Sequence, residues 1–328
     1  MIVVTGGAGF IGSAIVWALN QRGKENILII DHLGQDNDKW RNLASLRYLE
    51  YMEKDSFIDC IERDSLPDNI SCIIHMGACS ATTESDNSYL VKNNFKYSQA
   101  VASYCLDKHI RLIYASSAAT YGNGEQGYYD GIEDIEDLRP MNMYGYSKQM
   151  FDLWAKHNNV FDEMVGLKFS NVYGPNEYHK KDMRSVVLRA FEQIQENGTV
   201  KLFKSYKEEY KDGEQMRDFV YIKDVVKIIL HFLDHPEING LYNAGSGNAR
   251  TWNELANAVF RALNKEPNIE YIDMPDTIKA KYQYFTELDM ESLEKTGFKV
   301  AFKSLERNVK DYVQNYLLPI KHLGDEDL

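Results

Sequence analysis

Two residues within the stretch MNMYGYSKQM (residues 141–150) have the types and the spacing needed for proton transfer. Tyr144 and Lys148 are four residues apart, so on a helix they share one face, whereas Tyr146 points elsewhere. A tyrosine has a pKa of about 10 and is a poor base at neutral pH, but a neighbouring ammonium favours its phenolate form. The pair therefore indicates either a proton-transfer group or ordinary helix packing. The spacing alone does not decide between these two interpretations.

Two serines end the preceding apolar segment RLIYASS (111–117), which reads as a strand. Ligands of open α/β sheets bind at the carboxyl ends of the strands, so Ser116 and Ser117 stand where a hydroxyl can contact a ligand. We expect Ser117 to hold a reacting oxygen by a hydrogen bond while Tyr144 takes the proton.

Three regularly spaced glycines lie near the start of the chain, in VVTGGAGFIGSAI (3–15). Gly6, Gly9 and Gly12 follow a short apolar run and open an apolar-periodic helix. Glycines at these places allow a tight turn and close approach of the backbone to a pyrophosphate, which the helix N-terminus attracts. Asp31 ends the next apolar segment, nineteen residues after Gly12. This context predicts a dinucleotide-binding site.

The residues near Asp31 leave the choice of dinucleotide open. A carboxylate there accepts hydrogen bonds from a ribose and repels a 2′-phosphate, which favours NAD. Lys39, Arg41 and Lys54 either neutralise the 2′-phosphate of NADP or are ordinary surface cations.

Apolar segments that read as strands alternate with amphipathic segments that read as helices. The strands are expected at 1–6, 26–31, 72–78, 111–117 and 164–174. The helices are expected at 11–23, 87–109 and 146–159. This alternation predicts an α/β fold with a doubly wound parallel sheet (Rossmann) covered on both faces.

The second half of the chain has shorter elements and indicates a smaller α/β substrate lobe. A helix is expected at 181–198, and strands at 217–222, 241–246 and 269–274. We therefore divide the chain into a dinucleotide-binding domain, 1–172, with return segments near 217–246, and a substrate-binding lobe, 173–328. The last residues, 322–328, are expected to fray.

Composition and charge narrow the possible partners. The formal net charge of −12 argues against nonspecific binding to nucleic acid or to an anionic membrane. The longest apolar runs are far shorter than the roughly 20 residues that span a bilayer, and no signal-peptide pattern is present, so a cytoplasmic protein is expected. Cys60, Cys72, Cys79 and Cys105 lack metal-ligand spacing, so we expect reduced thiols and no metal site.

Together these motifs resemble those of the extended short-chain dehydrogenase/reductase family, of the NAD-dependent epimerase/dehydratase type. The family's serine, its Tyr-x-x-x-Lys pair and its glycine loop are matched by Ser117, by Tyr144 with Lys148, and by residues 6–12. The closer resemblance is to the branch that epimerises ADP-bound heptoses for lipopolysaccharide core synthesis, through stretches such as GACSATTE, FSNVYGPNEYHK, YNAGSG and KYQYFTELD. It implies an isomerase that oxidises C6″ of the heptose to a transient ketone and returns hydride to the opposite face.

The resemblance also implies which residues bind the two ligands. Cofactor contacts carry over to Gly6, Gly9, Phe10, Ile11, Gly12, Asp31, His32, Lys39, Lys54, Met76, Gly77, Ala78, Cys79, Ser80, Asn93, Lys148, Val172 and Lys180. Substrate contacts carry over to Ser117, Asn171, Asp182, Arg189, Phe203, Lys204, Ser205, Tyr206, Arg217 and Tyr282. The implied cofactor is NADP, alternatively NAD, bound tightly to each subunit; the implied substrate is an ADP-heptose. Similar epimerases are homo-oligomers, described as pentamers.

Two of these assignments have alternatives. Tyr144 serves one face of the reacting carbon, so a second acid/base group is useful, and the resemblance selects Lys180 within PNEYHKKD (175–182). The alternative is a basic loop that grips a substrate phosphate. Arg217 either pairs with diphosphate oxygens or forms an internal ion pair with Asp218.

The chain departs from the family pattern in two places. Asp182 and Arg189 stand where the family motif has a serine and a histidine, so their assignment rests on position alone. The acidic loops 123–138 and 204–216 are long, which makes the substrate contacts at 203–206 depend on an uncertain alignment.

Other functions for the same fold are a different nucleotide-sugar epimerase, a 4,6-dehydratase and a noncatalytic dinucleotide-binding sensor. A dehydratase needs carboxylates beside its serine, where this chain has Ala118 and Ala119. The intact serine, tyrosine and lysine argue against a sensor.

Overall fold

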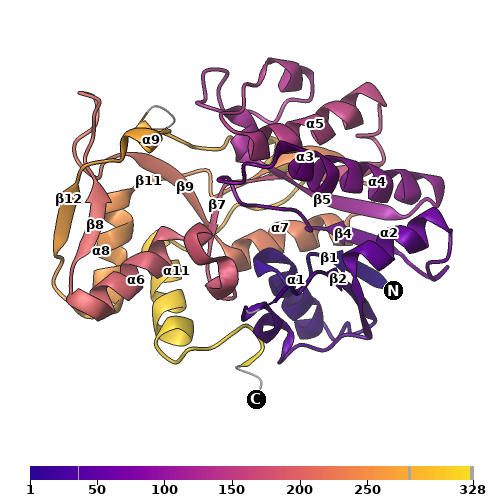
Figure 1. Cartoon of the computed structure of the whole chain (residues 1–328), viewed down its shortest axis with the longest axis horizontal. Helices are drawn as coiled ribbons and strands as arrows, with labels where there is room; N and C mark the ends of the chain where they lie inside the picture. Colours follow the sequence, from indigo (N-terminus) through magenta and orange to yellow (C-terminus); the bar gives the residue numbers. More distant parts are fainter. Residues whose placement is uncertain (36, 280–281, 326–328) are drawn as a thin grey trace.

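The computed structural model describes residues 1–35, 37–279 and 282–325, which form one large sheet with a smaller lobe beside it (Figure 1). In these residues, seven parallel strands form the main sheet in the order β10-β6-β5-β4-β1-β2-β3. Their bounds are β1 Ile2–Thr5, β2 Ile27–Asp31, β3 Glu50–Glu53, β4 Cys72–His75, β5 Arg111–Ser117, β6 Met164–Phe169 and β10 Gly240–Ala244. β1, β2, β4 and β6 are buried along their whole length, as apolar runs covered on both faces should be. The predicted doubly wound parallel sheet is confirmed.

Helices cover both faces of the main sheet. They are α1 Phe10–Gln21, α2 Lys54–Glu62, α4 Tyr97–Asp107, α5 Met143–His157 and α7 Ile222–Asp234. Val4 belongs to one apolar core with Ile15 of α1 and Ile228 of α7, whereas Val3 belongs to a second core with Phe57 of α2. Because neighbouring side chains of a strand point to opposite faces, these are the cores above and below the sheet.

The smaller lobe lies at the left in Figure 1 and contains two short sheets. One has the order β11-β9-β7 and the other pairs β12 with β8. The bounds are β7 Asn171–Tyr173, β8 Val200–Phe203, β9 Met216–Tyr221, β11 Ala249–Thr251 and β12 Ile269–Ile272. The helices of this part are α6 Val186–Asn197, α8 Trp252–Ala262, α9 Asp276–Lys279 and α11 Leu305–Tyr312, whereas α10 Glu291–Lys295 packs against β10 of the main sheet. None of the described helices is long and apolar enough to cross a membrane.

One strand prediction is corrected. The segment expected as one strand at 164–174 is two strands, because the chain leaves β6 at Ser170, whose N–H donates to the Ala244 carbonyl, and then pairs β7 with β9. The strand expected at 241–246 is β10, which pairs with β6 in the main sheet and lies in the range where return segments were expected. The domain boundary at residue 172 remains a prediction.

Two helix predictions are corrected in detail. The helix expected at 87–109 is α3 (Asn87–Leu90), a π-helical segment (Val91–Lys96) and α4 in succession. The helix expected at 181–198 begins only at Val186, because the Ser185 side chain accepts from the Leu188 N–H and caps it. It ends at Gly198 as predicted, in the left-handed conformation.

The expectation that the C-terminal end frays is wrong for the residues that the structure describes there. Leu323 is fully buried, and its N–H donates to the Asn176 side chain at 2.9 Å. The Tyr178 hydroxyl donates to the Lys321 carbonyl at 2.7 Å. Residues 326–328 lie outside the described part.

Candidate active site

The glycine loop between β1 and α1 is shaped by close backbone contacts. Gly6 has a φ of +65°, and a Cβ there would lie 2.8 Å from the backbone of Gly77. A Cβ on Gly12 would lie 2.1 Å from the Gly6 carbonyl oxygen, so only glycine fits. Gly9 caps α1 without a side-chain hydrogen bond. The N–H groups of the first turn are therefore available to a phosphate, and the loop fits a dinucleotide.

A cleft of about 360 Å³ opens above this loop. Most of the expected cofactor residues line it: Gly6, Gly9, Phe10, Ile11, Gly12, Asp31, His32, Lys39, Lys54, Met76, Gly77, Ala78, Cys79, Ser80, Asn93 and Lys180. Lys148 and Val172 are the two expected cofactor residues outside this lining. Five lining residues were not expected: Thr5, Ile30, Tyr89, Tyr97 and His179.

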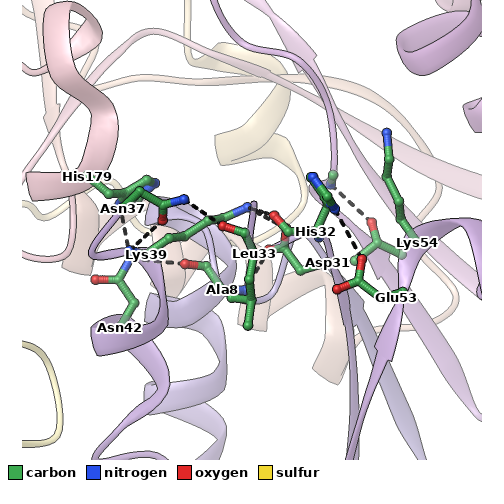
Figure 2. A network of polar contacts seen from close by, with 12 residues as sticks. Ala8, Asp31, His32, Leu33, Asn37, Lys39, Asn42, Glu53, Lys54 and His179 are labelled. Atoms are coloured by element: carbon green, nitrogen blue, oxygen red, sulfur yellow. Dashed lines mark hydrogen bonds and ion pairs between the residues drawn. The ribbon is translucent and has the colours of Figure 1, made fainter. Parts of the chain in front are cut away.

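The carboxylate of Asp31 is held by neighbours in the cleft (Figure 2). It accepts from the Ala8 N–H at 2.8 Å and from the His32 N–H at 2.6 Å, and the Lys39 ammonium pairs with it. Lys39 is thus a neutralising partner of Asp31 and not an ordinary surface cation. Arg41, by contrast, pairs with a surface aspartate outside the cleft.

Lys54 points into the same cleft from the start of α2. Its ammonium donates to the Asn93 side-chain oxygen at 2.6 Å (Lys54 is labelled in Figure 2) and lies 5.9 Å from the centre of the Tyr89 ring. These contacts join the end of β3 to the helical segment 87–107. Polar groups from both elements therefore line that side of the cleft.

Ser117 and Tyr144 meet at the carboxyl end of the main sheet. Ser117 ends β5, and its hydroxyl oxygen accepts from the Ala119 N–H at 3.1 Å. α5 begins just before Tyr144, because the Asn142 side chain caps it by accepting from the Gly145 N–H. Tyr144 then lies close enough to the Ser117 side chain for this side chain to influence its pKa.

Lys148 and Tyr146 take different directions from the same helix. Lys148 is buried, and its ammonium donates to the Ala115 carbonyl of β5 at 2.8 Å. Tyr146 is 47 % exposed. The interpretation that Tyr144, and not Tyr146, shares a face with Lys148 agrees with this arrangement.

Burial dominates the acid–base properties of the pair. It raises the pKa of Tyr144 above its ordinary value, and the Ser117 side chain opposes this effect. Burial lowers the pKa of Lys148 to about 8, while the charge of Asp152 acts in the opposite direction. In the free protein Tyr144 is therefore a neutral phenol at neutral pH, and its deprotonation needs added positive charge nearby.

Lys180 enters the cleft from the turn Tyr178–Met183. Its ammonium lies 5.1 Å from the centre of the Phe10 ring, at the start of α1. The buried carboxylate of Glu177 holds the turn by accepting from the Ser185 hydroxyl at 2.7 Å and from the Gly174 N–H at 3.2 Å. Burial lowers the pKa of Lys180, and the charge of Glu177 opposes the shift.

Arg217 is buried between two aromatic rings in the smaller lobe. Its guanidinium carbon lies 5.7 Å from the centre of the Trp252 ring and 5.3 Å from that of Tyr282. It donates to the Met216 carbonyl at 2.8 Å and to the Gln283 carbonyl. In the described part of the chain no carboxylate forms an ion pair with it, which leaves a buried positive charge for an anionic ligand to balance.

The alternative of an internal ion pair between Arg217 and Asp218 is wrong. The Asp218 carboxylate accepts instead from the N–H groups of Ser246 at 2.7 Å and Gly247 at 3.1 Å. Neighbouring residues of β9 point to opposite faces, which separates the two charges.

The remaining expected substrate residues lie in two groups. Near Arg217, the Phe203 ring meets the Tyr282 ring edge to face at 6.3 Å. Lys204 and Tyr206 both contact Asp273, at 3.3 Å and 3.0 Å. The Ser205 N–H donates to Asp212 at 2.8 Å. The other expected substrate residues lie elsewhere in the chain. Asn171 is exposed at the start of β7, and Arg189 donates to the carbonyl of the exposed Asp182. Their contacts with a substrate remain predictions.

Sequence reasoning missed Asn94, which connects the cofactor loop to the catalytic helix. Its side chain accepts from the Cys79 N–H at 2.8 Å and donates to the Cys79 carbonyl at 2.9 Å and to the Ser147 hydroxyl at 3.0 Å. Asn94 lies in the π-helical segment and is 1 % exposed. Two adjacent asparagines in the middle of a predicted helix, where their propensity is poor, are the signal that could have identified it.

Comparisons with known proteins agree with this geometry. The model of the NAD dependent epimerase/dehydratase family matches residues 2–245. The chain is 51 % identical over 317 residues to the ADP-L-glycero-D-manno-heptose-6-epimerase of Nitratidesulfovibrio vulgaris (strain DP4), covering 97 % of this chain and 98 % of that protein. It is 50 % identical over 326 residues to the enzyme of the same name from Fusobacterium nucleatum, with the same coverage. The crystal structure of the Helicobacter pylori ADP-L-glycero-D-manno-heptose-6-epimerase is similar with a TM-score of 0.80, at 27 % identity over 96 % of this chain and 95 % of that chain.

Proposed function

Because the chain belongs to the NAD dependent epimerase/dehydratase family, we propose that it is an isomerase that converts ADP-D-glycero-D-manno-heptose to ADP-L-glycero-D-manno-heptose. The step inverts C6″ of the heptose and serves lipopolysaccharide core synthesis. The names of relatives half identical to it over nearly the whole chain support the substrate. The observation that carries the chemistry is the proximity of Ser117 to Tyr144, one helical turn from Lys148, beside the dinucleotide cleft.

Tyr144 removes the hydroxyl proton at C6″ while Ser117 holds the reacting oxygen by a hydrogen bond. The pKa of Tyr144 is raised by burial, so the phenolate must be stabilised by a positive charge when it forms. Lys148 supplies one such charge at one turn's distance. After inversion, the same tyrosine or a second group returns the proton.

We assign Lys180 as that second acid/base group. Burial lowers the pKa of Lys180 toward neutral pH, which suits a group that both donates and accepts protons. The alternative role is to bind a phosphate, for which its place beside the glycine loop over Phe10 is equally suited. The two roles differ in their kinetic signature, since only proton transfer depends on the pKa of the lysine.

A nicotinamide dinucleotide fits the cleft, since the glycine loop leaves no space for side chains and α1 has free N–H groups. When bound, its oxidised ring accepts hydride from C6″ and its reduced ring returns it. Asp31 and Lys39 hold each other in an ion pair, which lowers the repulsion that Asp31 alone would exert on a 2′-phosphate. We therefore propose NADP, with NAD as the alternative.

Arg217 is the residue we propose for the substrate diphosphate. Its planar guanidinium is already oriented by two backbone carbonyls and two aromatic rings, so it can bind an anion with little loss of side-chain entropy.

The experiment has two parts. The purified protein is denatured and the released cofactor is identified by mass spectrometry, which separates NADP from NAD. The intact protein is then given each C6″ epimer of ADP-heptose without added cofactor, and the epimer ratio is followed by NMR, with UDP- and GDP-sugars as controls. We expect both ADP-heptose epimers to approach one equilibrium mixture. Conversion of a UDP- or GDP-sugar with ADP-heptose left untouched would overturn the assignment.

A further inference from the structure

A buried polar cluster lies beneath the catalytic residues, on the main-sheet side of α5. The Asp152 carboxylate accepts from the Tyr114 hydroxyl at 2.8 Å and from the Ser116 hydroxyl at 2.7 Å. The Lys168 ammonium of β6 pairs with the same carboxylate at 3.1 Å. Asp152 and Lys168 are 0 % and 1 % exposed. Neither residue lines the cofactor cleft.

The cluster is connected to the catalytic groups in two directions. Lys168 also donates to the Thr120 hydroxyl at 2.7 Å, and Thr120 donates to the carbonyl of Ser117 at 2.8 Å. Asp152 lies four residues after Lys148 on α5, so the two side chains share a face of the helix. One carboxylate of the helix that carries the catalytic lysine therefore contacts the strand that ends at Ser117.

We propose that Asp152 is a positioning residue of the reaction. It fixes the end of β5 against α5, and it supplies the negative charge that holds the Lys148 ammonium in place. This inference rests on the proposed function for its chemical meaning, but Asp152 and Lys168 themselves lie outside the lining of the cofactor cleft.

Charge balance supports this role. The Lys168 ammonium pairs with the Asp152 carboxylate, and the charge of this carboxylate also acts on the buried ammonium of Lys148. Two positive charges therefore stand against one negative charge near the place where the Tyr144 phenolate must form. The other titratable groups near Lys148 are Tyr144 on its own helix, His75 at the end of β4, and Cys79 in the loop that follows. The His75 side chain stays neutral, because burial lowers its pKa to about 3. Asp152 is then the carboxylate that opposes the effect of burial on the pKa of Lys148.

Stability alone does not explain such a pair. A buried ion pair is often no more stable than a well-packed apolar pair of the same volume, because both charges lose their hydration. The position of the Asp152–Lys168 pair between Ser117 and Lys148 instead fits a role in fixing the geometry and the charge of the catalytic residues.

The test measures Lys148 directly and needs no substrate. The protein is labelled with ¹³C at the lysine ε carbons, and the Lys148 signal is assigned by its loss in Lys148→Met. We expect the titration midpoint of Lys148 to fall in Asp152→Asn and to return toward the wild-type value in Asp152→Glu. A folded Asp152→Asn protein with an unchanged Lys148 midpoint would overturn the proposal, whether or not the substrate assignment is correct.

A second measurement uses activity toward whichever sugar nucleotide the wild-type protein converts. Activity needs the charged form of Lys148, so the pH above which turnover falls should move down in Asp152→Asn. One unit of change in pKa alters the charged fraction on that side about tenfold. If Asp152→Asn does not fold, the double variant Asp152→Asn with Lys168→Met also removes Lys168, which would otherwise lose its ion-pair partner in the core. In that variant too the midpoint and the pH profile should move down, and wild-type values for both would overturn the proposal.

Discussion

Replacing Arg217 tests the substrate site most directly. The guanidinium is buried, is stacked between the rings of Trp252 and Tyr282, and has no carboxylate partner among the described residues. A hydrogen bond to a charged group contributes about 1.5–3 kcal/mol, so losing its contact with a diphosphate should lower kcat/KM about 10- to 150-fold. Arg217→Met removes the charge and the donors. Arg217→Lys keeps the charge but loses the planar fork, so it should recover only part of the activity.

The assay separates substrate from cofactor. Steady-state epimerisation gives KM and kcat, and calorimetric titration with ADP reports binding of the diphosphate part alone. Cofactor content after purification should remain at the wild-type level, because the dinucleotide cleft lies on the other lobe. Most of the loss should be in KM, since the diphosphate is bound equally in the ground state and the transition state.

The matched control is Arg111→Met. Arg111 also donates to backbone carbonyls, those of Phe232 and Ile238, but it begins β5 at the end of the sheet away from the ligand edge. It should lower thermal stability and leave KM unchanged. Equal KM values for Arg217→Met and the wild-type protein would refute the assigned role, and so would an equal rise of KM in Arg111→Met.

Four further outcomes are expected. Tyr144→Phe should reduce turnover about 10²–10⁴-fold with an unchanged circular dichroism spectrum, while the exposed Tyr146→Phe keeps full activity; equal rates would contradict the assignment. Gly12→Ala should yield protein without bound cofactor, seen by absorbance, because its Cβ would overlap a carbonyl oxygen. Lys39→Met should weaken NADP binding about tenfold or more in fluorescence titrations and leave NAD binding nearly unchanged, and an equal effect on both cofactors would remove Lys39 from the choice. Burial lowers the pKa of His75 to about 3 in the folded protein, against an ordinary value of 6.5. Between these pH values the unfolded chain binds one proton more than the folded protein, so the free energy of unfolding falls as the pH drops from 6.5 toward 3. In urea unfolding, His75→Gln should lose less stability over that range.

The parts of the fold with a strong local signal were predictable. Continuous apolar runs identified the inner strands, and the glycine loop identified the cofactor end before any contact was known. β3 (Glu50–Glu53) was missed because EYME is an edge strand with charged ends and no apolar run. The break at Ser170 was missed because it depends on pairing with β9 and β10, which come later in the chain.

The site was predictable where its residues share one motif and not where they meet through the fold. Tyr144 and Lys148 are one turn apart in sequence, so their pairing needed no structure. The rings that enclose Arg217 come from residues 35 and 65 positions later, Trp252 and Tyr282, and no local pattern connects them. The Asp152–Lys168 pair was missed for the same reason: each charged residue reads as surface until the sheet brings them together.

The buried side chain of Asn176 connects helix α1 with the C-terminal residues that the structure describes. Its amide donates to the Ser13 hydroxyl of α1 at 2.9 Å, and its oxygen accepts from the Leu323 N–H at 2.9 Å. It stands four residues before Lys180, so the last described turn of the chain, around Leu323, helps to set the position of a proposed catalytic lysine. An enzyme immobilised through its C-terminus would transmit any pull on the support to this turn. For biosensors or surface-coupled assays, the attachment point should therefore be chosen elsewhere on the molecule.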